Sequence, residues 1–400
     1  MKNTWRFSAN ELNYVREVID SGFGSGTSGG MNNRFEAAFA EKVGAKYAIT
    51  FNSGTSTLHA GLFALGVHAG DEVIIPPLTV ISNVDVVIAQ NAIPVFADVD
   101  PHTFNIDPDD VRRKITPRTK CIMPVSLYGL SCDLDPIMEV ARAHGIGVIN
   151  DAAEALGATY KGKPIAKIAD ITSYSTENSK HIATGDGGII VTNNEDYATA
   201  MRKYGSLGYA AMKSGEGRIR INKDIFQDPN YKRHDSLGLN YRMPEVAAAL
   251  GLAQTERMEH FVNLRVGIGE LYLEALQGCD YLIPQRTPKG WLNTYWTFAA
   301  TYERKDVSWQ QFRKKYIEFG GDGIYAAWAL SYEETLMAEG HYRKHCPMIY
   351  DKLQYPRGIC PNAEAVQPKL MQFVTNYGSV DEARPMADAL RRTIKFFGRG

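Results

Sequence analysis

Short apolar strands and helices alternate between residues 47 and 149, and this alternation constrains the fold more than any other feature of the chain. The first strand runs into a Ser-Gly-Thr-Ser turn, and a helix follows at once. Alternation of this kind predicts an α/β fold with a mostly parallel sheet and helices on both faces. The predicted strands are residues 47–51, 72–75, 93–97, 121–125 and 146–149, and the predicted helices are residues 55–65, 81–90, 108–114 and 134–144.

Residues 170–190, DITSYSTENSKHIATGDGGII, break this pattern around Lys180. A short strand precedes the lysine, and a glycine turn with a second apolar strand follows it. Because no helix separates these short elements, they predict local antiparallel pairing. A lysine between a strand and a tight turn is expected at the edge of the sheet, where ligands of α/β folds bind. Most lysines are solvated surface residues, so the residues that share this edge decide the interpretation.

Two other strand ends supply complementary groups. Gly54, Thr55 and Ser56 open a helix, whose first backbone N–H groups form an anion site. Asp151 follows the strand at 146–149, and an acid there is costly to bury unless it meets a cation. The set meets the needs of pyridoxal 5'-phosphate (PLP): donors for the phosphate, a carboxylate for the protonated pyridinium nitrogen, and an amine for the aldehyde.

A family resemblance rests on seven segments that lie in the family's order within residues 5–260: KYAITFNSGTSTLHAGLFALG, GDEVIIPPLT, PVFADVDPHTFNID, KCIMPVSLYGLSCDLDPI, VINDAAEALGATYKGKPI, SYSTENSKHIATGDGGIIVTN and GLNYRMPEVAAALGLAQ. The chain resembles the DegT/DnrJ/StrS-type family of PLP-dependent sugar aminotransferases, which have the aspartate aminotransferase-like fold type I. The resemblance implies a large PLP-binding domain with a seven-stranded mostly parallel sheet, and a smaller C-terminal α/β domain. We place these domains at residues 1–260, including an N-terminal arm and a long loop at 208–236, and at residues 261–400.

The resemblance assigns the reactive groups. Lys180 is expected to form the Schiff base with PLP and then, as a free amine, to move a proton between substrate and cofactor. Asp151 is expected to pair with the pyridinium nitrogen; the alternative is a helix N-cap for residues 152–156. Glu154 is expected near the ring hydroxyl, with a capping-box acid as its alternative.

Phosphate contacts are expected from Gly54, Thr55, Ser56 and Ser175, although Ser175 is also compatible with an ordinary serine at the sheet edge. Asn240 matches an asparagine that family members donate across a dimer to the phosphate of the neighbouring subunit. The resemblance therefore implies a symmetric homodimer with shared active sites.

Two positions depart from or complicate the family pattern. Val80 occupies the place where the family commonly stacks an aromatic ring on the cofactor; valine packs on the ring but cannot π-stack. His181 is either a general base beside Lys180 or, because neighbours in a strand point to opposite faces, a residue directed elsewhere. The sugar 3-dehydratases that resemble this family carry His-His-Ile where this chain has Lys180-His-Ile, so the lysine favours an aminotransferase.

The acceptor is left open between a nucleotide-linked keto-deoxysugar and a Kdo-like ulosonic acid. The loop at 208–236 is either a solvated surface loop or a substrate cover whose cations meet an anionic group. Tyr325 and Trp328, in the segment GGDGIYAAWAL, either line an altered sugar pocket or belong to the core. The basic residues of the loop are Lys213, Arg218, Arg220, Lys223, Lys232, Arg233 and His234.

Charge and composition exclude other classes of function. The formal net charge is −1, which gives no electrostatic reason to expect binding to nucleic acid or an anionic membrane. No apolar run approaches the roughly 20 residues of a membrane span. The five cysteines lack C-x-x-C spacing and predict reduced thiols in the cytoplasm and no metal site.

The sequence thus predicts a cytoplasmic PLP-dependent aminotransferase that moves an amino group, with L-glutamate as the expected donor, to a keto or aldehyde sugar. The expected product serves surface polysaccharide or a glycosylated metabolite. The alternatives are a sugar 3-dehydratase and a non-catalytic regulator with the same fold.

Overall fold

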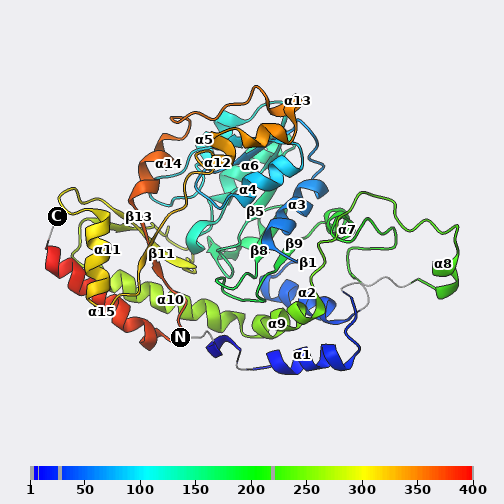
Figure 1. Ribbon diagram of the computed structural model, residues 1–400, viewed down its shortest axis with the longest axis horizontal. Coiled ribbons are helices and arrows are strands. Elements are labelled where there is room, and N and C mark those ends of the chain that lie inside the picture. Colours follow the sequence, from blue (N-terminus) through cyan, green and yellow to red (C-terminus); the bar gives the residue numbers. More distant parts are fainter. Residues whose placement is uncertain (1–3, 8, 26–28, 218–220, 399–400) are drawn as a thin grey trace.

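The computed structural model describes residues 4–7, 9–25, 29–217 and 221–398, and its centre is a seven-stranded sheet with the order β1-β9-β8-β5-β4-β2-β3 (Figure 1). Strand β9 pairs antiparallel with both of its neighbours, and every other pairing is parallel. The predicted mostly parallel sheet is confirmed. Its strands are β1 (Tyr47–Phe51), β2 (Glu72–Ile75), β3 (Ile93–Phe96), β4 (Thr119–Ile122), β5 (Gly147–Asp151), β8 (Ile171–Ser175) and β9 (Gly188–Thr192).

Strand β4 differs from its prediction, because it ends at Ile122 and not at residue 125. Pro124 follows, and proline has no N–H to donate to a ladder. Its carbonyl still accepts from the backbone N–H of Asp151 at 2.9 Å. The strand predicted at 146–149 therefore extends to Asp151, which places that acid at the last rung of the sheet.

Alternate residues of the strands contribute to two hydrophobic cores, one on each face of the seven-stranded sheet. In β2, Val73 and Ile75 join the core beneath α3, α4 and α7. Ile74 joins the other core, beneath α2, α5, α6 and α9; α1 packs on the outside of α9. The helices are α1 (Glu11–Asp20), α2 (Met31–Val43), α3 (Gly54–Ala64), α4 (Ser82–Ala89), α5 (Pro108–Lys114), α6 (Leu134–His144), α7 (Glu195–Tyr204) and α9 (Glu245–Glu256).

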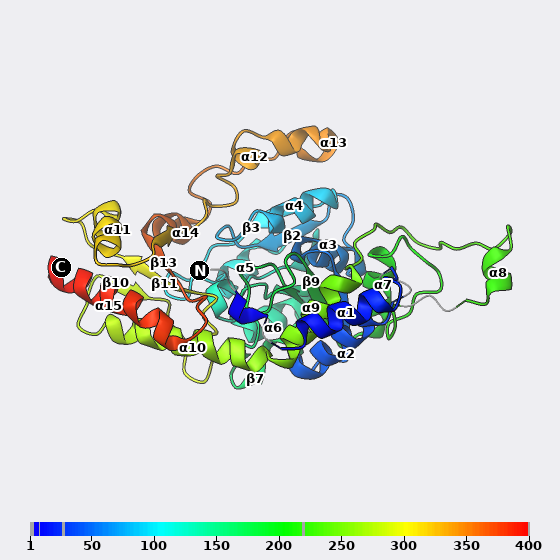
Figure 2. The same cartoon turned by 60° about the horizontal axis from the view of Figure 1, so that its bottom comes forward.

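A second, antiparallel sheet with the order β10-β11-β13-β12 forms a smaller layer with α10, α11 and α15 (Figures 1 and 2). Helix α10 contributes Val262 to a core of the seven-stranded sheet and Ile268 to the core of the smaller layer. It therefore runs across the predicted boundary between the two domains at residue 260. This boundary stays a prediction. The elements are α10 (Met258–Ala275), β10 (Leu282–Pro284), β11 (Thr297–Tyr302), α11 (Trp309–Glu318), β12 (Ile324–Ala326), β13 (Leu370–Val374) and α15 (Val380–Phe397).

Residues 327–366 leave the small sheet after β12 and return along the large one, where α12 (Thr335–Ala338) and α13 (Pro347–Tyr350) lie beside α4 and β3 (Figure 2). The Tyr350 hydroxyl donates to the carbonyls of Ile88 and Ala92 at 3.2 and 2.9 Å. At the start of α14 (Pro361–Val366), Asp98 accepts from two backbone N–H groups. These bonds fix the segment against the large sheet.

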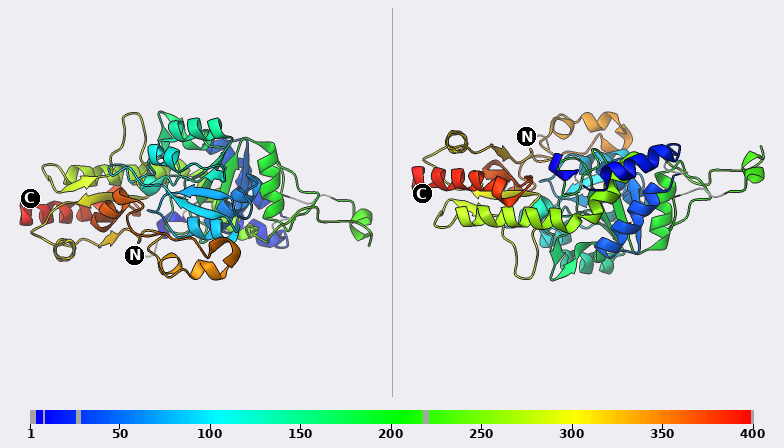
Figure 3. Two further views of the ribbon diagram at one scale, coloured as in Figure 1. Left: turned by 90° about the horizontal axis from the view of Figure 1, so that it is seen from above. Right: turned by 90° about the horizontal axis from the view of Figure 1, so that it is seen from below.

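The loop at 208–236 projects away from the body of the molecule, with α8 (Lys223–Gln227) near its far end (Figures 1 and 3). None of the residues of α8 is buried. No helix in the described part of the chain combines the length and hydropathy needed to cross a membrane. The remaining short elements are β6 (Thr159–Tyr160), β7 (Lys163–Pro164) and the 3-10 helices Thr4–Arg6, Leu127–Gly129, Ile165–Lys167, His341–Lys344 and Gln367–Lys369.

Candidate active site

A cavity of about 320 Å³ lies at the carboxyl ends of β1, β5 and β8, the edge at which α/β sheets bind ligands. Most of the predicted site residues line it, and Ser56 and Asn240 do not. The residues that line it are Ser53, Gly54, Thr55, Leu58, Thr79, Val80, Ser82, Val125, Leu127, Asp151, Ala153, Glu154, Ser175, Glu177, Ser179, Lys180, Asp186, Gly187, Trp296 and Trp328.

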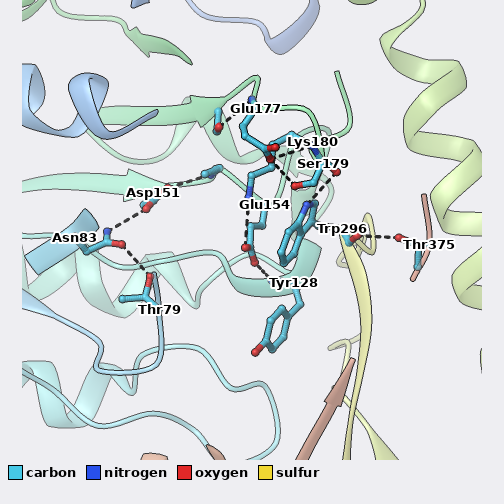
Figure 4. Close-up of polar contacts among 12 residues, drawn as sticks. Thr79, Asn83, Tyr128, Asp151, Glu154, Glu177, Ser179, Lys180, Trp296 and Thr375 are labelled. Atoms are coloured by element: carbon cyan, nitrogen blue, oxygen red, sulfur yellow. Dashed lines mark hydrogen bonds and ion pairs between the residues drawn. The ribbon is translucent and has the colours of Figure 1, made fainter. Parts of the chain in front are cut away.

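Lys180 lies in the loop between β8 and β9, with its amine inside the cavity (Figure 4). Its Nζ is 3.5 Å from Glu154 Oε1 and 4.1 Å from the centre of the Trp296 ring. The backbone of the loop is held by two arginines. Arg6 donates to the carbonyls of Lys180 and His181, and Arg265 donates to that of Lys180. The lysine is therefore presented from a fixed backbone.

Asp151 is buried at the end of β5, and it forms no ion pair with any described residue. Its Oδ2 accepts from Asn83 Nδ2 at 3.0 Å, and its Oδ1 accepts from the Ala153 N–H at 3.0 Å. Burial raises the pKa of Asp151 above its usual range. A buried carboxylate that is oriented but lacks a paired cation is suited to a positively charged ligand group.

Glu154 faces Lys180 across the cavity (Figure 4). Its Oε2 accepts the Tyr128 backbone N–H at 3.0 Å, and Tyr128 has a left-handed φ of 61°. Burial raises the pKa of Glu154, and nearby Lys180 opposes this rise. No helix follows Asp151, since residues 152–158 form turns. The N-cap alternative for Asp151 and the capping-box alternative for Glu154 are therefore wrong.

The start of α3 forms a cradle of backbone N–H groups. Thr55 lines the cavity, and Ser56 lies behind it, where its hydroxyl donates to Asn52 Oδ1 at 2.7 Å and completes a capping box with Ser53. Ser56 thus fixes the helix end from behind and does not face the cavity. Ser175, at the end of β8, approaches Gly54 so closely that a Cβ on the glycine would lie 3.1 Å from the serine Cβ.

Gly54→Ala is expected to weaken cofactor binding by about tenfold, because the added methyl group pushes Ser175 away from the cradle. Fluorescence titration of the apoprotein with PLP measures this affinity. Gly30→Ala is the control, since a Cβ at that position meets no atom within 4 Å. If Gly54→Ala and the unmodified protein bind PLP with equal affinity, the assignment of Gly54 to the phosphate site is contradicted.

Val80 lines the cavity and is 38% exposed; its place beside the cofactor ring stays a prediction. His181 is fully buried and directed elsewhere, with its Nε2 2.9 Å from the Thr294 carbonyl oxygen. Burial lowers the pKa of His181 well below its usual value. Of its two interpretations, the structure supports the residue directed away from the site.

Neither Asn240 nor any described residue of the loop at 208–236 lines the cavity. Asn240 is exposed and pairs with Ser206 in an isolated bridge. The described part of the loop extends away from the body of the molecule (Figure 1); Arg218 and Arg220 lie outside the described residues. The glycine-rich arm at residues 22–30 also contributes no described residue to the cavity.

Several site residues were not singled out from the sequence. Thr79 Oγ1 donates to Asn83 Oδ1 at 2.9 Å, which turns the Asn83 amide group toward Asp151 (Figure 4). No local signal singled out Asn83, because Ser82 and Asp85 of the same helix are polar as well. Glu177 accepts from the N–H and hydroxyl of Ser179. Trp296 also lines the cavity. Of the two residues for which the sequence left pocket and core open, Trp328 lines the cavity and Tyr325 does not.

These residues fit PLP. The cradle at Gly54 and Thr55 suits a phosphate, the unpaired buried Asp151 suits a protonated ring nitrogen, and Lys180 offers the amine. When bound, PLP supplies a ring that takes up the electron pair left when a substrate carbon loses a proton.

Comparisons with known proteins agree with this geometry. The DegT/DnrJ/EryC1/StrS aminotransferase family matches residues 6–372. A GDP-perosamine synthase from Caulobacter vibrioides is 43% identical over 68% of this chain and 68% of its own length. A GDP-perosamine synthase from Escherichia coli O157:H7 is 36% identical over 77% of this chain and 80% of its own.

Solved structures share the fold over nearly the full length. An aminotransferase from Psychrobacter cryohalolentis superposes with a TM-score of 0.84 at 28% identity, covering 98% of this chain and 97% of its own. The prediction of a PLP-dependent sugar aminotransferase of fold type I is confirmed, and the chain belongs to the DegT/DnrJ/EryC1/StrS aminotransferase family.

Proposed function

We propose that this enzyme takes its amino group from L-glutamate and passes it to a nucleotide-linked keto sugar. The observation that supports the chemistry best is the convergence of Lys180, Asp151 and the Gly54 cradle on one cavity. The relatives named GDP-perosamine synthase favour an acceptor carried on a nucleotide. A Kdo-like ulosonic acid is the alternative acceptor, and turnover of the two by the purified enzyme distinguishes them.

Lys180 is the proposed proton carrier. Its amine lies against the Trp296 ring and within 3.5 Å of Glu154, so a proton held at Nζ is stabilised on both sides. Asp151 would keep a positive charge on the ring nitrogen of bound PLP, and the bonds of Thr79 to Asn83 and of Asn83 to Asp151 hold this carboxylate in place. The presence of lysine at position 180 favours this reaction over that of a sugar 3-dehydratase.

An absorption spectrum of the purified protein, before and after addition of L-glutamate, tests the donor half-reaction. We expect a visible band from the lysine-bound cofactor that shifts to shorter wavelength when the amino group is transferred. A band that forms but does not respond to L-glutamate contradicts the proposed donor. The absence of a band after PLP is supplied favours the non-catalytic alternative.

We propose that the enzyme acts as a homodimer with shared sites. Asn240 cannot serve its own cavity from its exposed position, whereas a neighbouring subunit could receive it. The adjoining loop carries exposed apolar side chains, among them Ile225 at 51% and Phe226 at 40% exposure. Apolar surface of this kind favours association. The basic residues of the loop would then meet the anionic part of an acceptor bound to the neighbour.

Mixing two inactive variants tests this arrangement. A heterodimer of Lys180→Ala and Asn240→Ala has one site with both defects and one site with neither, provided that Asn240 acts on the partner's site. After random exchange of subunits we expect about a quarter of the unmodified activity. If Asn240 acts within its own subunit, no intact site forms and mixing restores nothing. Analytical ultracentrifugation checks that each variant remains dimeric.

We place the enzyme in the cytoplasm. Its five cysteines are free, and Cys121, Cys132 and Cys360 are buried, which suits a reducing compartment. Labelling of fractionated cells with an antibody tests this location.

A further inference from the structure

Two tryptophans form one continuous wall of the cavity, and the proton transfer requires only the first. The Trp296 ring lies against the Lys180 amine at 4.1 Å. The Trp328 ring stacks beside it, with centroids 6.1 Å apart and planes inclined by 27°. Trp328 is 36% exposed, so the wall runs from the reactive amine to the mouth of the cavity.

The inner tryptophan is held by more than packing. Its Nε1 donates to the Ser179 carbonyl at 3.2 Å (Figure 4). Its own carbonyl accepts from Arg265 and from Thr375 at 2.7 and 2.8 Å. The orientation of the Trp296 ring is therefore tied to the same backbone that presents Lys180.

The outer tryptophan is fixed to the opposite rim of the cavity. It follows β12, and its carbonyl accepts from Gln367 at 3.0 Å. Three residues further on, both the N–H and the hydroxyl of Ser331 donate to the Pro77 carbonyl, at 2.8 and 3.0 Å. Pro77 lies just before Thr79 and Val80, which line the large-sheet side. These hydrogen bonds preorganise the wall in the absence of a ligand, which lowers the entropic cost of binding.

The charges around the wall favour a neutral ring. Lys180 is the single cation among the described residues that line the cavity, and it is engaged in the amino transfer. Two carboxyl groups that are not assigned to the cofactor, those of Glu177 and Asp186, also line the cavity. Carboxylates of this kind accept hydrogen bonds from the hydroxyl groups of a sugar.

We propose that the Trp296–Trp328 wall is the platform for the acceptor's sugar ring, and that Trp328 determines which ring is accepted. This inference rests on the proposed function. The reacting carbon must come within reach of Lys180 Nζ, so the ring that carries it lies over Trp296. The rest of that ring then extends over Trp328, with its C–H face on the aromatic surface and its hydroxyl groups toward the carboxylates. Any anionic part of the acceptor lies beyond the mouth.

Calorimetric titration of the protein loaded with pyridoxamine phosphate tests the wall without turnover. The probes are GDP-mannose, GDP and free Kdo. GDP lacks a hexose, so the ratio of its dissociation constant to that of GDP-mannose isolates the contribution of the sugar. In the unmodified protein we expect either a ratio of at least about ten or measurable Kdo binding.

Trp328→Ala is expected to lower that sugar-dependent affinity by about tenfold and to leave GDP binding within about twofold. Trp328→Phe, which keeps a ring, should retain an intermediate affinity and remains informative if the alanine variant fails to fold. Tyr325→Ala is the matched control, since Tyr325 is 62% exposed in the same segment and does not line the cavity.

Two results overturn the inference. In the first, the sugar-dependent affinity of Trp328→Ala lies within about twofold of that of the unmodified protein. In the second, the unmodified protein binds GDP-mannose no more tightly than GDP and does not bind Kdo. Either result can occur with an intact response to L-glutamate, whereas a failure of the proposed function removes that response itself.

Discussion

Lys180→Ala is expected to lower amino transfer by at least about 10⁴-fold, because the variant has no amine to move the proton. The visible band of the lysine-bound cofactor should also disappear. PLP should still bind, since the cradle at Gly54 and Thr55 and the carboxylate of Asp151 are unchanged. Steady-state kinetics and dialysis against PLP measure the two properties separately.

The control is Lys305→Ala, which removes an exposed lysine far along the chain and should leave both properties unchanged. Methylamine added to Lys180→Ala should restore part of the activity, because a small free amine can occupy the vacated space. Wild-type turnover in Lys180→Ala would show that another group is the reactive amine.

Asp151→Asn is expected to reduce turnover by about 10²–10³-fold with the fold retained, because an amide cannot hold a proton on the ring nitrogen by charge. The expected loss is mainly in kcat, since phosphate contacts still bind the cofactor. Asp20→Asn, at an exposed position, is the control. If the kcat of Asp151→Asn is unchanged, a residue other than Asp151 pairs with the ring nitrogen.

Thermal unfolding of the apoprotein provides a second readout for Asp151. Its folded pKa is raised above the ordinary value of 3.8 by burial, so the folded state resists ionisation of this group. That penalty is absent below 3.8 and grows as the pH rises toward the folded pKa. The Tm of Asp151→Asn minus that of the unmodified apoprotein should therefore become more positive as pH rises. A difference that falls with pH contradicts the environment described for Asp151.

Local sequence signals identified the candidate reactive groups, because each stands at a strand end with its own signature. Lys180 follows a strand and precedes a glycine turn, Asp151 ends an apolar strand, and Gly54 opens a helix. In each case the signature lies within a few neighbouring residues. Family resemblance supplied their roles, and the structure brings these three residues to one cavity.

Groups that act through other elements could not be found in this way. Asn83 reaches Asp151 across 68 residues of chain. Trp296 precedes β11 and Trp328 follows β12, so their rings stack only once the small sheet has formed, with β13 between these two strands. Ser56 shows the converse case. Its local pattern matched a phosphate ligand, which stays a prediction, whereas the capping bonds at the start of α3 engage its hydroxyl outside the cavity.

The sequence by itself determined the fold class, because hydrophobic periodicity and turn residues act over short stretches of chain. Together with the family resemblance it also gave the cofactor and the candidate for the reactive lysine. Only the tertiary structure decided which residues orient Asp151, where His181 points, and what forms the wall beside Lys180. Those outcomes depend on contacts between elements far apart in sequence. Their geometry is set by how two sheets and the segment at 327–366 pack together, which no local pattern specifies.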